Sequence, residues 1–296
     1  MTPTLVRRAG ALTLIATTAV ALAACGPGSA KLTFHDTVPV KTTAIELTGH
    51  SGSVAVTALP ISETRITRVV RRGSDPEQSY RVDGTKLSLD TRCGPDCTVS
   101  YQVEVPTGVA VTGTLNSGDI TLDGVASADV AVTSGDIAIK GTTGRVKALS
   151  TSGTITATGT RGPVSLQATS GDVHATDLAG GPVDVRVTSG DADLGLAVAT
   201  SVRAETSSGD IHLRVPAGGR YQVHAAADSG DLRLDGVADD PSATNVLDLR
   251  AGSGDVTVTA GEPGRVPAAP SAPAYPSAPA APSAPAAPAT PSSKPA

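Results

Sequence analysis

Apolar and polar residues alternate through most of the region from residue 107 to 260, on both sides of a recurring Ser-Gly corner. Positions three, five and seven before each corner glycine, and two and four after it, are almost always apolar or small. A period of two predicts that each corner joins two half-buried β-strands. The corners, spaced 17 to 24 residues apart, lie at Gly118, Gly135, Gly153, Gly171, Gly190, Gly209, Gly230 and Gly254.

The repeat predicts a stack of short coils, because one such unit cannot bury its apolar side without neighbours. Stacking would place opposite charges side by side, with Asp184 next to Arg203 and Arg186 next to Glu205. The predicted fold class is all-β, a single-stack β-solenoid similar to a β-helix, with about eight or nine short coils. In the unit around Gly190 the predicted inward residues are Val183, Val185, Val187, Ala192 and Leu194.

Composition agrees with thin layers of strand. The chain has one Phe, four Tyr and no Trp, which disfavours a thick aromatic core. Five segments are expected. Residues 1–24 form a signal peptide and 25–37 a lipid-anchored linker, while 38–106 form an N-terminal β cap that includes a first coil around Gly52. The solenoid repeats then occupy 107–260, and a tail occupies 261–296. Prolines recur at every third position of that tail from 267 to 291, which predicts a disordered, extended spacer or a glycosylated stalk.

The N-terminus carries two arginines and an apolar run that stops at Leu22-Ala23-Ala24-Cys25. This pattern is typical of a signal peptide and is too short to span a membrane. The residues before Cys25 resemble the lipobox of bacterial lipoproteins, which implies a lipid on the Cys25 thiol. The protein would then be anchored to the extracytoplasmic face of the cell membrane. The alternative is an ordinary cleaved signal that leaves Cys25 as a free thiol.

Removal of residues 1–24 takes away Arg7 and Arg8 and no acids, so 23 − 2 = 21 basic residues face 28 acidic ones, a balance of −7. This excess of acid disfavours nucleic acid as a partner. One basic cluster, Arg65, Arg68, Arg71 and Arg72, could touch anionic lipid. A solvated strand face is the preferred interpretation.

Cys93 and Cys97 flank Gly94-Pro95-Asp96 between two strand-like runs. In an oxidising compartment the pair predicts a disulfide that staples one hairpin. Zinc is the alternative, but the pair lacks nearby histidines to complete a ligand set.

The repeats resemble the bacterial putative-adhesin family of β-strand-repeat envelope proteins, over about residues 38–260. The similarity is clearest from Val103 to Val111, leading into Asn116-Ser117-Gly118-Asp119-Ile120. The resemblance implies a β-solenoid at the cell envelope, and it implies no particular ligand.

Two sets of polar residues are candidate sites. The corner acids are expected to form a file down one edge that caps turns rather than binding calcium. They are Asp119, Asp136, Asp172, Asp191, Asp210, Asp231 and Asp255. Three residues after their corner glycines, His174, Asp193 and His212 would form an outward column that could bind zinc. A solvated polar column is the preferred interpretation there.

These features favour a surface binding or adhesion module, with a cell-wall polymer or a surface protein as its partner and no cofactor. A structural spacer or envelope-sensing scaffold is the alternative. A polysaccharide-acting β-helix enzyme is disfavoured, because the acids recur evenly instead of clustering and no catalytic motif is present.

Overall fold

A computed structural model describes residues 17–20, 30–72, 79–94 and 97–261. All of them lie in one compact unit, Met1–Gly264. Cys25 and the proline-rich tail lie outside the described residues, so the lipid anchor and the tail stay predictions. The described residues form strands and turns without helices. Accordingly, they include no helix with the length and hydropathy needed to cross a membrane.

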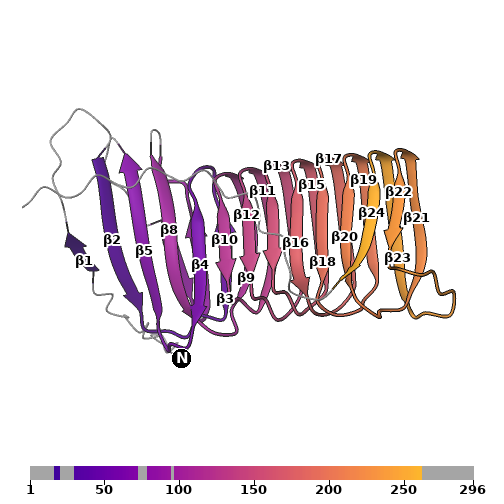
Figure 1. Ribbon diagram of the computed structural model, residues 1–296. Coiled ribbons are helices and arrows are strands. Elements are labelled where there is room, and N and C mark those ends of the chain that lie inside the picture. The colour runs from indigo at the N-terminus through magenta and orange to yellow at the C-terminus, as the bar shows by residue number, and fades with distance from the viewer. Residues whose placement is uncertain (1–16, 21–29, 73–78, 95–96, 262–296) are drawn as a thin grey trace, which may run out of the picture. The chain divides into compact units, whose positions relative to one another are not determined.

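The strands form two sheets, and most neighbouring strands run parallel (Figure 1). The first sheet contains, in spatial order, β1 (Thr17–Val20), β2 (Ala30–Val38), β5 (Thr64–Arg72), β8 (Thr98–Pro106), β4 (Val54–Leu59), β10 (Ile120–Asp123), β12 (Ile137–Lys140), β14 (Ile155–Thr158), β16 (Val173–Leu178), β18 (Ala192–Leu196), β20 (Ile211–Pro216), β24 (Val256–Gly261) and β22 (Leu232–Asp235). The second sheet contains β21 (Tyr221–Ser229), β23 (Asn245–Ser253), β19 (Val202–Ser208), β17 (Val183–Ser189), β15 (Val164–Ser170), β13 (Val146–Ser152), β11 (Ser127–Ser134), β9 (Ala110–Ser117), β3 (Ala44–Thr48), β7 (Lys86–Asp90) and β6 (Tyr80–Asp83).

Each Ser-Gly corner carries the chain from the second sheet to the first, as in a solenoid. The predicted inward side chains around Gly190 are all buried, from Val185 at 0% exposed to Val187 at 3%. Asp184 pairs in register with Arg203, and Arg186 pairs with Glu205. The period of two and the register predicted from charge are therefore confirmed.

The corner glycines are required because the corners stack backbone on backbone. Gly190 has φ of +137°, and a Cβ added there would lie 2.4 Å from the carbonyl oxygen of Gly171. Its N–H donates to the carbonyl of Ser208 on the next coil at 3.0 Å. A side chain at this position would break both the conformation and the contact.

From β9 and β10 the coils follow chain order as far as β19 and β20, and then the order changes. The last coil, β23 and β24, lies between that coil and the earlier coil formed by β21 and β22. Leu247 pairs with both Val202 of β19 and Val223 of β21. The last coil is therefore inserted, and the coil of β21 and β22 forms the end of both sheets.

The opposite end of the stack is built from antiparallel strands. β5 runs antiparallel to both β2 and β8, and β6 runs antiparallel to β7. Arg68 is 7% exposed, with its guanidinium carbon 4.6 Å from the centroid of the Phe34 ring. The expected solvated basic face is therefore wrong for Arg68, because its position on β5 points inward.

A disulfide joins Cys93 and Cys97, whose Cα atoms are 5.4 Å apart. The preceding strand β7 belongs to the second sheet and the following strand β8 to the first. The expected hairpin is therefore wrong, because the two flanking strands do not pair. The disulfide instead closes a short loop in the connection between the sheets.

Candidate functional site

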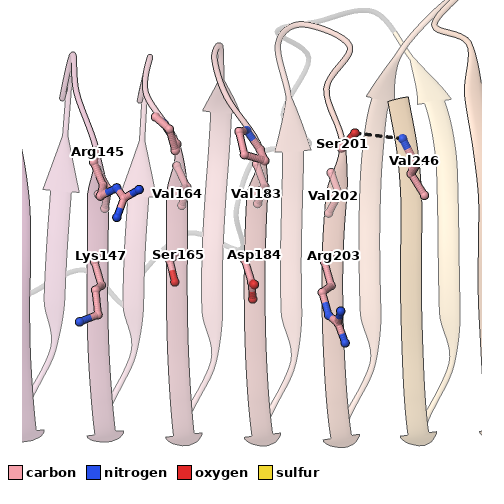
Figure 2. A pocket seen from close by; sticks show the side chains of 13 residues that line it. Arg145, Lys147, Val164, Ser165, Val183, Asp184, Ser201, Val202, Arg203 and Val246 are labelled. Carbon is pink, nitrogen blue, oxygen red and sulfur yellow. Dashed lines mark hydrogen bonds between the residues drawn. The ribbon is translucent and has the colours of Figure 1, made fainter. Parts of the chain in front are cut away.

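A groove of about 410 Å³ runs across the outer face of the second sheet, from β13 to β23 (Figure 2). We call it the proline groove. Its upper row comprises the residues that precede the first inward residue of each strand, namely Arg145, Pro163, Pro182, Ser201 and Val246. Its lower row, two residues further along each strand, comprises Lys147, Ser165, Asp184 and Arg203.

The rows are straight because the strands are in exact register. Val146, Val164, Val183 and Val202 pair in sequence from one strand to the next, and each of them is at most 2% exposed. Their neighbours on either side consequently point outward. Strands about 4.8 Å apart give a groove of about 19 Å over the four steps from β13 to β23.

The side chains of the upper row are short and largely apolar, because proline and serine occupy three of its positions. The rings of Pro163 and Pro182 are rigid and carry no N–H, while their carbonyls accept the N–H groups of Val146 and Val164 at 2.9 and 3.0 Å. Further along, the N–H of Val246 donates to Ser201 Oγ at 3.0 Å (Figure 2). The polar backbone groups named here therefore have hydrogen-bond partners. The upper row beyond Arg145 consequently presents a largely apolar surface.

The charged side chains of the proline groove differ in how far they are already paired. Lys147 lies 3.5 Å from Asp129 and Asp184 lies 3.1 Å from Arg186. A hydrogen bond from Arg203 to Glu205 raises the pKa of Arg203 and lowers that of Glu205. Arg145 is exposed and has no side-chain hydrogen bond or ion pair among the described residues. Arg145 is therefore the cation best placed to take an external anion.

The proline groove was not predicted from the sequence, because the outward positions of the repeat indicated only the register of the strands. One signal was present. The tripeptide Gly-Pro-Val occurs at 162–164 and again at 181–183, each time directly before the first inward valine. Proline at two equivalent repeat positions indicates a shared surface feature rather than two unrelated turns.

The predicted histidine column lies on the first sheet, on the other side of the stack. His174, Asp193 and His212 occupy paired positions on β16, β18 and β20. His174 Nδ1 is 3.3 Å from Asp193 Oδ2. Among the described residues, no three or more His, Cys, Asp or Glu side chains form a group that could hold a metal ion. Metal binding at this column stays a hypothesis.

Most of the corner acids accept hydrogen bonds from backbone N–H groups on neighbouring coils. In each of these bonds, Oδ1 of one aspartate accepts the N–H of the corresponding residue on the next coil, at 2.8 to 3.1 Å. The bonds run from Asp119 to Asp136, Asp136 to Thr154, Asp172 to Asp191, Asp191 to Asp210, Asp210 to Asp255, and Asp255 to Asp231. This bonding accounts for the aspartates without a bound cation.

Comparison with known proteins identifies the family. A search of curated proteins finds no match. Among solved structures, the chain is similar to a putative cell adhesion protein from Clostridium sporogenes ATCC 15579, at 10% identity and a TM-score of 0.25 over 77% of this chain and 99% of that one. It is also similar to a putative adhesin from Bacteroides fragilis NCTC 9343, at 15% identity and a TM-score of 0.41 over 79% of this chain and 100% of that one.

The family model described as Toastrack DUF4097 matches residues 28–176 and 163–259, which together cover most of the sequence. The two matched ranges overlap between residues 163 and 176 and include the Ser-Gly corners. The chain therefore belongs to the Toastrack DUF4097 family.

Proposed function

We propose that the protein is a binding module of the cell surface, tethered by a lipid on Cys25, and that the proline groove is its binding site. The observation that carries the proposal is a largely apolar row, formed by Pro163, Pro182 and Val246, with the unpaired cation Arg145 at one end. A straight, shallow groove of this kind suits an extended chain rather than a compact small molecule.

The proposed ligand is an extended segment of a protein partner that carries apolar side chains and a carboxylate. At about 3.3 Å per residue, a groove of about 19 Å holds roughly six residues. Apolar side chains would cover Pro163 and Pro182, and the carboxylate would pair with Arg145. The lining contains no aromatic ring on which a sugar could stack, which makes a polysaccharide the weaker candidate.

No catalytic role is proposed. The acids at the corners are spread evenly along the stack, and Asp119, Asp136, Asp172, Asp191, Asp210 and Asp255 each accept a backbone N–H. An acid–base pair would need two carboxylates held apart in a shared cleft with different environments.

The test is selection from a library of displayed 12-residue peptides on the immobilised protein. Enriched peptides should combine acidic and apolar residues, and Arg145→Glu should weaken their binding by about tenfold or more. Lys140→Glu, the same change of charge on β12 of the other sheet, should leave binding unaltered. Enrichment that survives Arg145→Glu would remove the proline groove from consideration. A failure to enrich any peptide would favour a spacer without a ligand.

A further inference from the structure

The end of the stack formed by β21 and β22 leaves its core residues uncovered. Leu232 and Leu234 are 45% and 37% exposed, yet they pair in register with Val256 and Val258, which are fully buried. They therefore occupy inward positions, and no further coil of the described residues covers them. Of the three exposed large hydrophobic side chains among the described residues, two are at this end and the third is Val198.

Both sheets also present an unpaired strand edge here, because β21 ends one sheet and β22 ends the other. The start of β21 is partly covered. The carbonyl of Tyr221 accepts the N–H of Asp240, and the N–H of Val223 donates to Asp239 Oδ1, both at 2.9 Å. The stretch from His224 to Asp228 is left as the free edge, and such an edge readily pairs with another strand.

We propose that two copies of the protein join end to end through this coil, about a twofold axis normal to the sheets. Under that symmetry each edge strand pairs antiparallel with its own copy, so that both layers continue from one molecule into the next. The contact would place Leu234 beside Leu234 of the second copy, and Leu232 opposite Gly236 of that copy. It would leave the proline groove open, because the groove lies on the outer face of the sheet.

The outward residues of both edge strands match this symmetry. The sequence Asp231-Leu232-Arg233-Leu234-Asp235, paired antiparallel with itself about Leu234, places Arg233 opposite Asp235 of the second copy, and does so twice. On β21, pairing about Ala226 places His224 opposite Asp228 of the second copy. Opposite charges at directly facing positions favour this register. Pairing about Leu234 or about Ala226 places no two like charges opposite each other.

A second copy fits better than another kind of partner. The end presents two parallel layers at the spacing of packed sheets, about 10 Å. A single strand or helix could cover only one of them. The opposite end of the same unit has antiparallel strands and a buried Arg68, so head-to-tail stacking would bring unlike edges together.

The test measures the mass of the exported protein carrying Cys25→Ser, by light scattering across a dilution series. The wild-type end should give a dimer, and Leu234→Lys should raise the dissociation constant by about tenfold or more. Val198→Lys introduces the same charge at another exposed hydrophobic side chain, and it should leave the dimer intact. A monomer at all concentrations, or a dimer unaffected by Leu234→Lys, would overturn the proposal.

A second variant guards against misfolding of the lysine variant. Ala226→Cys should form a disulfide-linked dimer on mild oxidation, because the twofold axis brings the two side chains together, whereas Val198→Cys should not. A linked dimer from Val198→Cys alone would place the contact elsewhere. Species larger than a dimer would indicate open-ended stacking, which also contradicts a closed twofold contact.

Discussion

Asp255 Oδ1 accepts the backbone N–H of Asp231 at 2.9 Å, although Asp255 comes 24 residues later in the chain. The N–H of Asp255 itself donates to Asp210 Oδ1 at 2.8 Å. The corner of the last coil therefore bridges two corners that precede it in sequence. These two hydrogen bonds follow from the position of β23 and β24 between the coil of β19 and β20 and the coil of β21 and β22.

The insertion predicts that two deletions of similar length have very different effects. Deleting Asp136–Gly153 removes one internal layer and rejoins equivalent positions, so the protein should keep its β-structure with a modest loss of stability. Deleting residues 245–261 removes the layer that holds β21 and β22, so the coil formed by these two strands should unfold. Circular dichroism and limited proteolysis of the two variants distinguish these outcomes. Equal proteolytic resistance near Tyr221 in both deletions would contradict the inserted order.

Replacement of a corner glycine should be far more damaging than replacement of a turn glycine. Gly190→Ala forces a Cβ to within 2.4 Å of the Gly171 carbonyl oxygen, and the loss should be about 3 kcal/mol or more. Gly218→Ala at φ of +76° meets no atom within 4 Å. It carries only the conformational cost of about 1–2 kcal/mol. Denaturant unfolding measures both, and similar losses would argue against stacked corners.

Loss of a corner carboxylate should destabilise the protein modestly. Asp191 Oδ1 accepts the N–H of Asp210 at 2.8 Å, and Asp191→Ala should lower the free energy of unfolding by about 1 kcal/mol. Asp191→Asn keeps an acceptor oxygen and should lose less. Thermal unfolding of the two variants provides the comparison. An asparagine variant as unstable as the alanine variant would show that the hydrogen bond contributes little.

Acid should weaken the end of the stack through Asp255. The hydrogen bond from the Asp231 N–H, with a further one from Arg233, lowers the pKa of Asp255 below its ordinary value of 3.8. The resulting stabilisation is present above the unfolded-state pKa, near pH 4, and is lost as the pH falls through the lower folded-state value. Asp255→Asn should flatten this dependence below about pH 4. Unfolding curves at several pH values provide the measurement, and an unchanged slope would contradict it.

Cys25→Ser should release the protein from the membrane fraction, because the expected anchor is a lipid on that thiol. Cell fractionation and intact mass spectrometry of the wild-type protein and the variant provide the measurement. Cys93→Ser is the control, since it also replaces a cysteine by serine but leaves the lipobox intact. Membrane association that persists in Cys25→Ser without loss of acyl mass would refute lipid anchoring.

Within the repeats, the sequence pattern predicted the alternation of inward and outward residues and the register of neighbouring strands, whereas the inward position of Arg68 on β5 was not predicted. Burial of valine and leucine at every second position requires this arrangement, as Val183 to Leu194 illustrate. The order of the last two coils could not be predicted, because both have the same corner and similar apolar positions, and that pattern does not indicate which coil lies next to β19 and β20. The groove was missed for a related reason: its depth depends on small and ring side chains, such as Ser201 and Pro182, at outward positions where the fold imposes little constraint.

The inserted coil also sets the sequence of events by which the protein matures. A chain released from its N-terminus can add layers one by one as far as β20. The segment from Tyr221 to Asp235 then remains unpaired until residues 245–261 have been synthesised and have formed the coil between it and β19 and β20. The last two coils therefore form in a single step. In a nascent chain that stops before Asn245, the segment from Tyr221 to Asp235 has no neighbouring coil and is accessible to proteases.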